Sequence, residues 1–176
     1  MYSSDHAPYR VDDTGKLIAG KRAAFPKIAN GLPGIETRLT LLFSKGYVKG
    51  RVTLNHFVQL AAGNVARIYG LNHRKGSIAE GLDVDIAIWD PDETRIIRAD
   101  ELHDNMDYSP YEGMEVTGWP TTVIRRGDII VADGELLAER ASGEFIERRK
   151  SDFTGMPGRL APELDPIKKL GTDLGL

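Results

Sequence analysis

Asp5 is the residue whose type and setting most favour chemistry, because it follows a short strand-like segment and begins a long loop. Barrel enzymes place catalytic groups at such positions, at the carboxyl end of a strand. A carboxylate can bind Zn²⁺ and can also accept a proton from metal-bound water. Spacing alone also allows a simpler role, in which Asp5 caps a turn. The adjacent His6 could bind a metal or hydrogen-bond to the loop, but we favour packing or the support of other metal ligands.

Residues 30–36 form a second candidate site, because Gly31 and Gly34 permit backbone shapes and close approaches that a Cβ would block. Such a segment can offer main-chain N–H and C=O groups to a polar ring with alternating donors and acceptors. The alternative is a turn that leads into a helix, with Pro33 near the first helical position.

Other catalytic patterns are missing from the sequence. His56, His73 and His103 form no H-x-H or H-E-x-x-H arrangement, so we interpret them as structural. The chain has no cysteine, which excludes disulfides, thiolate metal sites and cysteine nucleophiles. It also lacks a G-x-S-x-G elbow and a phosphate-binding loop.

Composition narrows the function classes further. The 176 residues carry a net charge of −3 and no basic stripe, which argues against a nucleic-acid partner. No apolar stretch approaches the roughly 18 residues of a membrane span, and the first residues do not resemble a signal peptide. We therefore expect a soluble, cytoplasmic protein without a membrane partner.

Helical periodicity is concentrated in the first half of the chain, after a long loop over residues 8–33. Apolar residues three and four apart predict a helix over residues 34–45 that ends at Gly46. Thr53 is a good N-cap for a second helix over residues 54–62. Gly63 and Asn64 should break that helix, and a short third helix follows over residues 64–69.

The second half of the chain reads as short strands. Strands are predicted over residues 85–90, 94–97, 121–126, 128–131 and 136–138. Pro91 should end the first of them, and Gly127 should form a tight hairpin turn. The order of elements is unusual for an independent domain. It fits an α/β protein made of the end of a (β/α)₈ barrel followed by an appended sheet.

Six segments in order carry a family resemblance: residues 4–8, 25–36, 62–71, 75–91, the run Pro110-Tyr111-Glu112-Gly113, and residues 131–135. Together they resemble the hydantoinase/dihydropyrimidinase family of cyclic amidohydrolases. The Pro-Tyr-Glu-Gly run favours this family over its allantoinase and dihydroorotase relatives.

The resemblance implies the last strand, loop and helices of a metal-dependent (β/α)₈ barrel in residues 1–72. Residues 73–155 would be part of a small β-sandwich, and residues 156–176 a C-terminal tail. Family members hold two divalent metals, usually zinc, and a metal-bound hydroxide opens a cyclic amide of hydantoin or dihydropyrimidine type. Asp5 matches a metal ligand and proton carrier of this family, and Asn30 matches the position whose main chain contacts the substrate ring.

The resemblance also implies that this chain is incomplete as an enzyme. The family's histidine ligands and bridging lysine belong to polypeptide upstream of the segment that Asp5 matches, and this sequence does not contain them. Three alternatives stay open: part of a split or truncated hydrolase, the product of a disrupted gene, or a non-catalytic scaffold protein. We expect the chain alone to be inactive, an upstream barrel polypeptide to complete the site, and the assembled enzyme to be a homotetramer.

Overall fold

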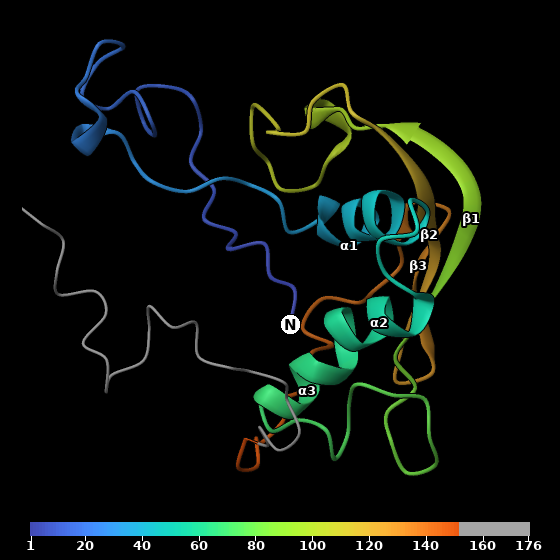
Figure 1. The fold of residues 1–176 in the computed structure, drawn as a ribbon. Helices are drawn as coiled ribbons and strands as arrows, with labels where there is room; N and C mark the ends of the chain where they lie inside the picture. The colour runs from blue at the N-terminus through green and yellow to red at the C-terminus, as the bar shows by residue number, and fades with distance from the viewer. Residues whose placement is uncertain (152–176) are drawn as a thin grey trace, which may run out of the picture.

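The computed structural model describes residues 1–151, in which two helical segments lie against the concave side of one curved sheet (Figure 1). The first segment joins α1 (Thr37–Leu41) to a π-helical turn, η2 (Leu42–Tyr47). The second joins α2 (Leu54–Val58), the π-helical turn η3 (Gln59–Gly63) and α3 (Asn64–Ile68). The sheet is an antiparallel meander in the order β1 (Ile86–Ile96), β2 (Glu115–Arg125), β3 (Asp128–Ala132) and β4 (Glu135–Leu136). Two 3₁₀ turns, η1 (Phe25–Lys27) and η4 (Ala99–Glu101), lie in the connecting loops.

The predicted helices form, but three of their predicted ends are wrong. Thr53 caps α2 as expected, because its hydroxyl accepts the backbone N–H of His56 at 3.2 Å. Gly63 does not break the helix, because it adopts right-handed helical angles and the π-helical turn η3 continues into α3. The first helix likewise passes through Gly46 and ends at Tyr47. The missing Cβ of Gly46 leaves room for the side chain of Val52. That helix begins at Thr37 rather than at residue 34.

The strands at residues 85–90 and 94–97 are one strand, β1, so the prediction that Pro91 ends the first of them is wrong. The pairing of β1 with β2 shifts register between Asp90 and Thr94. A proline can stay within a strand at such a bulge, because its missing N–H is not needed for the ladder. The carboxylate of Asp90 holds the bulge by accepting the backbone N–H groups of Asp92 at 2.9 Å and Glu93 at 3.1 Å.

The hairpin around Gly127 is confirmed, whereas the other strand bounds differ from the prediction. β2 begins at Glu115, well before the expected residue 121, and β4 covers Glu135–Leu136 rather than residues 136–138. The strand end expected near residues 2–4 is not formed in the described part of the chain. Its place is taken by one parallel bridge between His6 and Leu32.

Aromatic rings join the helices to the sheet. Phe43 stacks on Trp89 of β1 at 5.1 Å between ring centroids, and it meets Phe57 of α2 edge-on at 5.6 Å. Gly118 of β2 faces Phe43 so closely that a Cβ there would lie 2.2 Å from Cδ1 of the ring. The absence of a side chain at position 118 therefore allows the helix η2 to pack directly on the strand.

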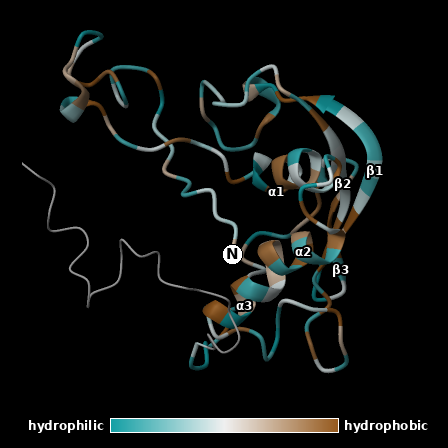
Figure 2. Ribbon diagram, viewed as in Figure 1, coloured by the Kyte–Doolittle hydropathy of each residue, from teal (hydrophilic) through white to brown (hydrophobic). Residues whose placement is uncertain are grey.

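A second apolar cluster joins Leu41 to Ile97 and Val116. Beyond these contacts the core is thin, because only six apolar side chains are buried within residues 1–151. Large apolar side chains on the sheet and loops stay open to solvent, among them Ile78 at 81% and Leu136 at 75% exposure. In Figure 2, the brown of hydrophobic residues occurs on both the helices and the sheet. The described residues therefore leave much apolar surface uncovered.

Within residues 1–151, no helix combines the length and the apolar content that crossing a bilayer requires.

Candidate functional site

The two candidate segments from the sequence lie side by side. His6 and Leu32 form a parallel bridge, and the backbone N–H of Ala7 donates to the carbonyl of Leu32 at 3.2 Å. Gly31 makes this approach possible, because a Cβ there would lie 2.3 Å from the carbonyl oxygen of Ala7. Gly31 also has a φ of +122°, a conformation that other residues rarely adopt. The structure therefore brings together the segment that carries Asp5 (residues 4–8, the Asp5 segment) and the turn centred on Asn30 (residues 29–31, the Asn30 turn).

His6 hydrogen-bonds to the loop, which is one of the roles that the sequence left open. Its Nδ1 accepts the backbone N–H groups of Gly34 at 3.2 Å and Ile35 at 3.3 Å, just before α1 begins. A ring nitrogen that accepts hydrogen bonds carries no proton, so the neutral ring bears its hydrogen on Nε2. His6 thereby fixes the segment that carries Asp5 to the start of α1.

Asp5 is exposed and stands in a left-handed backbone conformation, with a φ of 48°. Aspartate tolerates this region better than most residues, and such conformations cluster at functional sites. Its backbone N–H donates to Ser3 Oγ at 3.4 Å, while its carboxylate has no hydrogen-bond partner within residues 1–151. The carboxylate is therefore free to bind a group from outside the described chain.

The described residues do not fit a metal ion by themselves. No group of three or more histidine, cysteine, aspartate or glutamate side chains comes together within residues 1–151. A tetrahedral zinc site takes three or four protein ligands, and Asp5 supplies one carboxylate. The expected zinc pair would therefore need ligands that this part of the chain does not provide.

Lys16 is a residue of the site that sequence reasoning missed. Its ammonium donates to the carbonyl of Ala29 at 3.0 Å and to the carbonyl of Gly31 at 2.7 Å, on either side of Asn30. Asn30 itself is exposed, and its N–H and C=O groups have no partner among the described residues. Lys16 is one of three lysines inside a glycine- and proline-rich loop, and no spacing rule distinguishes it from the other two.

The long loop is also tied to the segment that follows β1. The carboxylate of Asp107 accepts the backbone N–H of Val11 at 2.9 Å, and the guanidinium of Arg10 donates to the carbonyl of Asn105 at 3.2 Å. The ring of Tyr111 lies next to Gly34. The Pro-Tyr-Glu-Gly run therefore lies beside Gly34, just before α1, although the two are far apart in the sequence.

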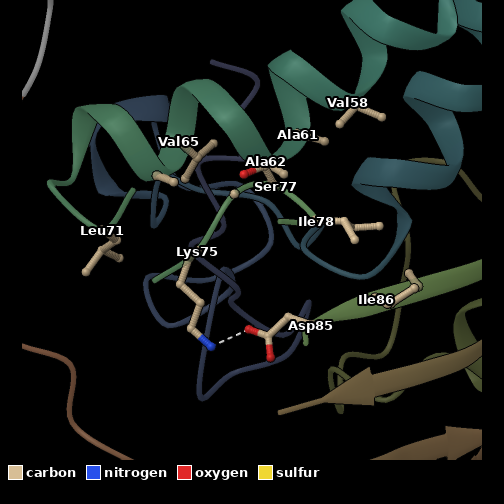
Figure 3. Close-up of a pocket in the computed structure, with 13 residues that line it drawn as sticks. Val58, Ala61, Ala62, Val65, Leu71, Lys75, Ser77, Ile78, Asp85 and Ile86 are labelled. Carbon is tan, nitrogen blue, oxygen red and sulfur yellow. Dashed lines mark hydrogen bonds and ion pairs between the residues drawn. The ribbon is translucent and has the colours of Figure 1, made fainter. Parts of the chain in front are cut away.

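A cavity of about 410 Å³ lies between the α2–α3 segment and the chain that enters β1 (Figure 3). Its lining is mostly apolar, with Val58, Val65 and Ile78 among the side chains that point toward it. Neither Asp5 nor Asn30 lines it, and its charged groups, Lys75 and Asp85, are paired with each other. The cavity therefore offers no free charged group for catalysis.

Beside this cavity, Arg74 and Lys75 pair with three carboxylates, those of Asp83, Asp85 and Glu144. Hydrogen bonds from Lys75 and Arg74 lower the pKa of Asp83 below its ordinary value of 3.8. A hydrogen bond from Arg74 likewise lowers the pKa of Glu144 below its ordinary value of 4.5. The cluster connects the chain that enters β1 to the segment around residue 144.

This cluster predicts a loss of stability in acid. A carboxylate whose pKa is lower in the folded state stabilises it above the unfolded pKa, and the contribution disappears as pH falls through the folded value. We expect the midpoint of urea unfolding to be steady above about pH 5 and to fall below about pH 4. The variant Asp83→Asn should show a shallower fall, whereas Asp92→Asn, at an exposed carboxylate without an ion pair among residues 1–151, should follow the wild type. An equally steep fall in both variants would contradict the assignment.

Comparison with known proteins agrees with the resemblance seen in the sequence. The model of the amidohydrolase family matches residues 1–130. D-hydantoinase from Geobacillus stearothermophilus is 44% identical over 147 residues, which are 84% of this chain and 30% of that protein. D-hydantoinase from Ralstonia pickettii is 43% identical, over 84% of this chain and 32% of that protein. The chain thus spans about a third of the length of these relatives.

Solved structures show the same similarity in three dimensions. A D-hydantoinase structure aligns with a TM-score of 0.78 at 42% identity, over 84% of this chain and 32% of that one. The dihydropyrimidinase from Brevibacillus agri NCHU1002 aligns with a TM-score of 0.80 at 39% identity, over 85% of this chain and 32% of that one. The fold described above is therefore similar to that of part of a hydantoinase. The chain belongs to the amidohydrolase family, and its expected kinship with hydantoinases and dihydropyrimidinases is confirmed.

Proposed function

We propose that this chain is part of a hydrolase that opens cyclic amides of the hydantoin or dihydropyrimidine type. The proposal rests on D-hydantoinases that are 44% and 42% identical to this chain over 84% of its length. In this proposal residues 1–72 are the end of a (β/α)₈ barrel, and residues 73–155 are part of a β-sandwich. We propose that the tail over residues 156–176, which lies outside the described residues, makes an intersubunit contact.

Asp5 and Asn30 are the residues proposed to act on the substrate. Hydrolysis of an amide needs a group that takes a proton from the attacking water and returns it to the leaving nitrogen. The carboxylate of Asp5 suits this task because it is exposed and has no partner within residues 1–151. The free N–H and C=O of Asn30 are suited to hydrogen-bond the ring, and the His6–Leu32 bridge holds both segments together.

The rest of the active site is proposed to come from another polypeptide. Asp5 is one proposed metal ligand, and the remaining ligands of a zinc pair would lie in the part of the fold that the relatives have in addition, about two-thirds of their length. The uncovered apolar surface of the sheet and helices supports this, since a partner of that size would cover it. We propose that the assembled enzyme is a cytoplasmic homotetramer and that the chain alone is inactive.

Reconstitution tests this proposal. The chain is co-expressed with the portion of the Geobacillus stearothermophilus D-hydantoinase to which it does not align, and hydantoin ring opening and bound zinc are measured. We expect ring opening and stoichiometric zinc in the complex and neither in the chain alone. Stoichiometric zinc in the chain alone, or a well-formed complex that loads zinc but opens no ring, would contradict the proposal.

The second candidate is a non-catalytic scaffold protein of the same fold. The absence of a three-ligand group within residues 1–151 favours it, because a binding protein needs no metal ligands. The reconstitution distinguishes the two, since a scaffold would form the complex without turnover. Adding dihydrouracil, allantoin and dihydroorotate to the assay separates a hydantoinase from an allantoinase-like or dihydroorotase-like relative.

A further inference from the structure

We propose that Lys16 is a positioning residue that presents the backbone of Asn30 to the substrate ring, an inference that rests on the proposed function. Its ammonium donates to the carbonyls of Ala29 and Gly31, the residues immediately before and after Asn30. A lysine ammonium has three hydrogens and no acceptor, so one group can hold two carbonyls at once. Lys16 therefore acts as a clamp across the Asn30 turn.

The clamp determines which way Asn30 faces. The peptide bond between Ala29 and Asn30 is planar and trans, so the carbonyl of Ala29 and the N–H of Asn30 point in opposite directions. Because that carbonyl points at Lys16, the N–H of Asn30 points away from the lysine. The N–H of Asn30 has no protein partner among the described residues, and neither does its carbonyl. One residue thus offers a donor and an acceptor, which complement the adjacent C=O and N–H of a cyclic amide.

The loop holds Lys16 in place for this task. Its backbone N–H donates to the carbonyl of Arg10 at 2.8 Å, and its ammonium lies 6.0 Å from the centre of the Tyr9 ring. The turn between them is tight, because a Cβ on Gly15 would lie 2.3 Å from the carbonyl oxygen of Arg10. The Val11–Asp107 hydrogen bond anchors the same turn to the segment that follows β1. The lysine therefore reaches Asn30 from a fixed base rather than from a free loop.

The clamp should also raise the affinity of the turn for the substrate ring. A turn held in one conformation loses less entropy when a ring binds to it than a turn that must first become ordered. Removal of the ammonium should therefore weaken ring binding more than it slows the chemical step, which the carboxylate of Asp5 carries. This separation distinguishes a positioning role from a general structural one.

The first test is on the 176-residue chain itself. The variant Lys16→Met keeps the apolar stem beside Tyr9 and removes the ammonium. Its matched control is Lys21→Met, at an exposed lysine of the same loop without a partner in the described residues. We expect the ¹³C carbonyl signals of Ala29 and Gly31 to shift in Lys16→Met, and the amides of Gly34 and Ile35, which donate to His6, to exchange about tenfold faster. The sheet amides should keep their rates, and Lys16→Arg should restore part of the protection. Unchanged carbonyl signals in Lys16→Met would overturn the clamp.

The second test uses the reconstituted enzyme and separates this inference from the proposed function. We expect Lys16→Met to raise KM for hydantoin about tenfold and to leave kcat within about twofold. This is the pattern expected when the lost interaction stabilises the bound substrate and the transition state equally. Equal KM values for wild type and Lys16→Met, or a fall in kcat alone, would overturn the positioning role while the hydrolase assignment stands. A wild-type complex that opens no ring would refute the proposed function, and with it the positioning role, even if the carbonyl signals respond.

Discussion

Replacement of Asp5 by alanine in the reconstituted enzyme is expected to lower kcat for hydantoin by about 10³-fold, the usual scale for loss of a proton-transferring group. The reason is that the carboxylate is proposed to carry the proton from the attacking water to the leaving nitrogen. KM should change little if the ring is held by Asn30. Steady-state kinetics of the purified complex measure both constants.

Two further variants make the Asp5 result specific. Asp5 has a φ of 48°, which asparagine adopts readily and alanine does not, so Asp5→Asn removes the charge without the backbone cost. Asp13→Ala removes an exposed aspartate of the same loop that has no partner among the described residues. We expect Asp5→Asn to be as inactive as Asp5→Ala, and Asp13→Ala to be fully active. An Asp5→Asn complex that retains its turnover would refute the proposed role.

The largest effect on stability is expected for Gly118→Ala. The new Cβ would lie 2.2 Å from Cδ1 of Phe43, and this ring cannot withdraw because it is buried against Trp89 and Phe57. Overpacking of a core, together with the cost of a φ of +90° for alanine, should lower the free energy of unfolding by about 3 kcal/mol. Urea unfolding followed by tryptophan fluorescence measures the difference, since Trp89 is part of the cluster.

Gly134→Ala is the matched control for this variant. Gly134 has a φ of +85°, close to that of Gly118, but a Cβ there would meet no atom within 4 Å. It should therefore cost only the backbone strain, about 1 kcal/mol. Equal losses in the two variants would show that the contact with Phe43 does not limit the packing.

Local signals in the sequence predicted those parts of the fold that local interactions determine. The cap at Thr53 and the hairpin at Gly127 each depend on a few adjacent residues, and both form as predicted. Gly63 and Pro91 were misjudged because each is accommodated by its surroundings, a π-helical turn in one case and a bulge against β2 in the other. Propensity at one position does not contain that information.

The candidate site likewise combines features that the sequence predicted with features that depend on distant contacts. The types of Asp5 and Asn30, together with the family resemblance, marked the two segments, and the bridge between His6 and Leu32 brings them together. Lys16 escaped prediction because its partners are backbone carbonyls 13 and 15 residues away, which leave no trace in side-chain type. Interactions of this kind depend on the path of the chain and have no sequence pattern of their own.

Strand β1 pairs on one side only within the described residues, because it ends the order β1-β2-β3-β4. Its outer edge and the half-exposed Ile88 and Ile96 are therefore available to any other extended chain. While a ribosome produces this polypeptide without a companion, new copies are prone to join strand to strand. Simultaneous synthesis with a companion, or a chaperone that shields the edge, would keep the product in solution.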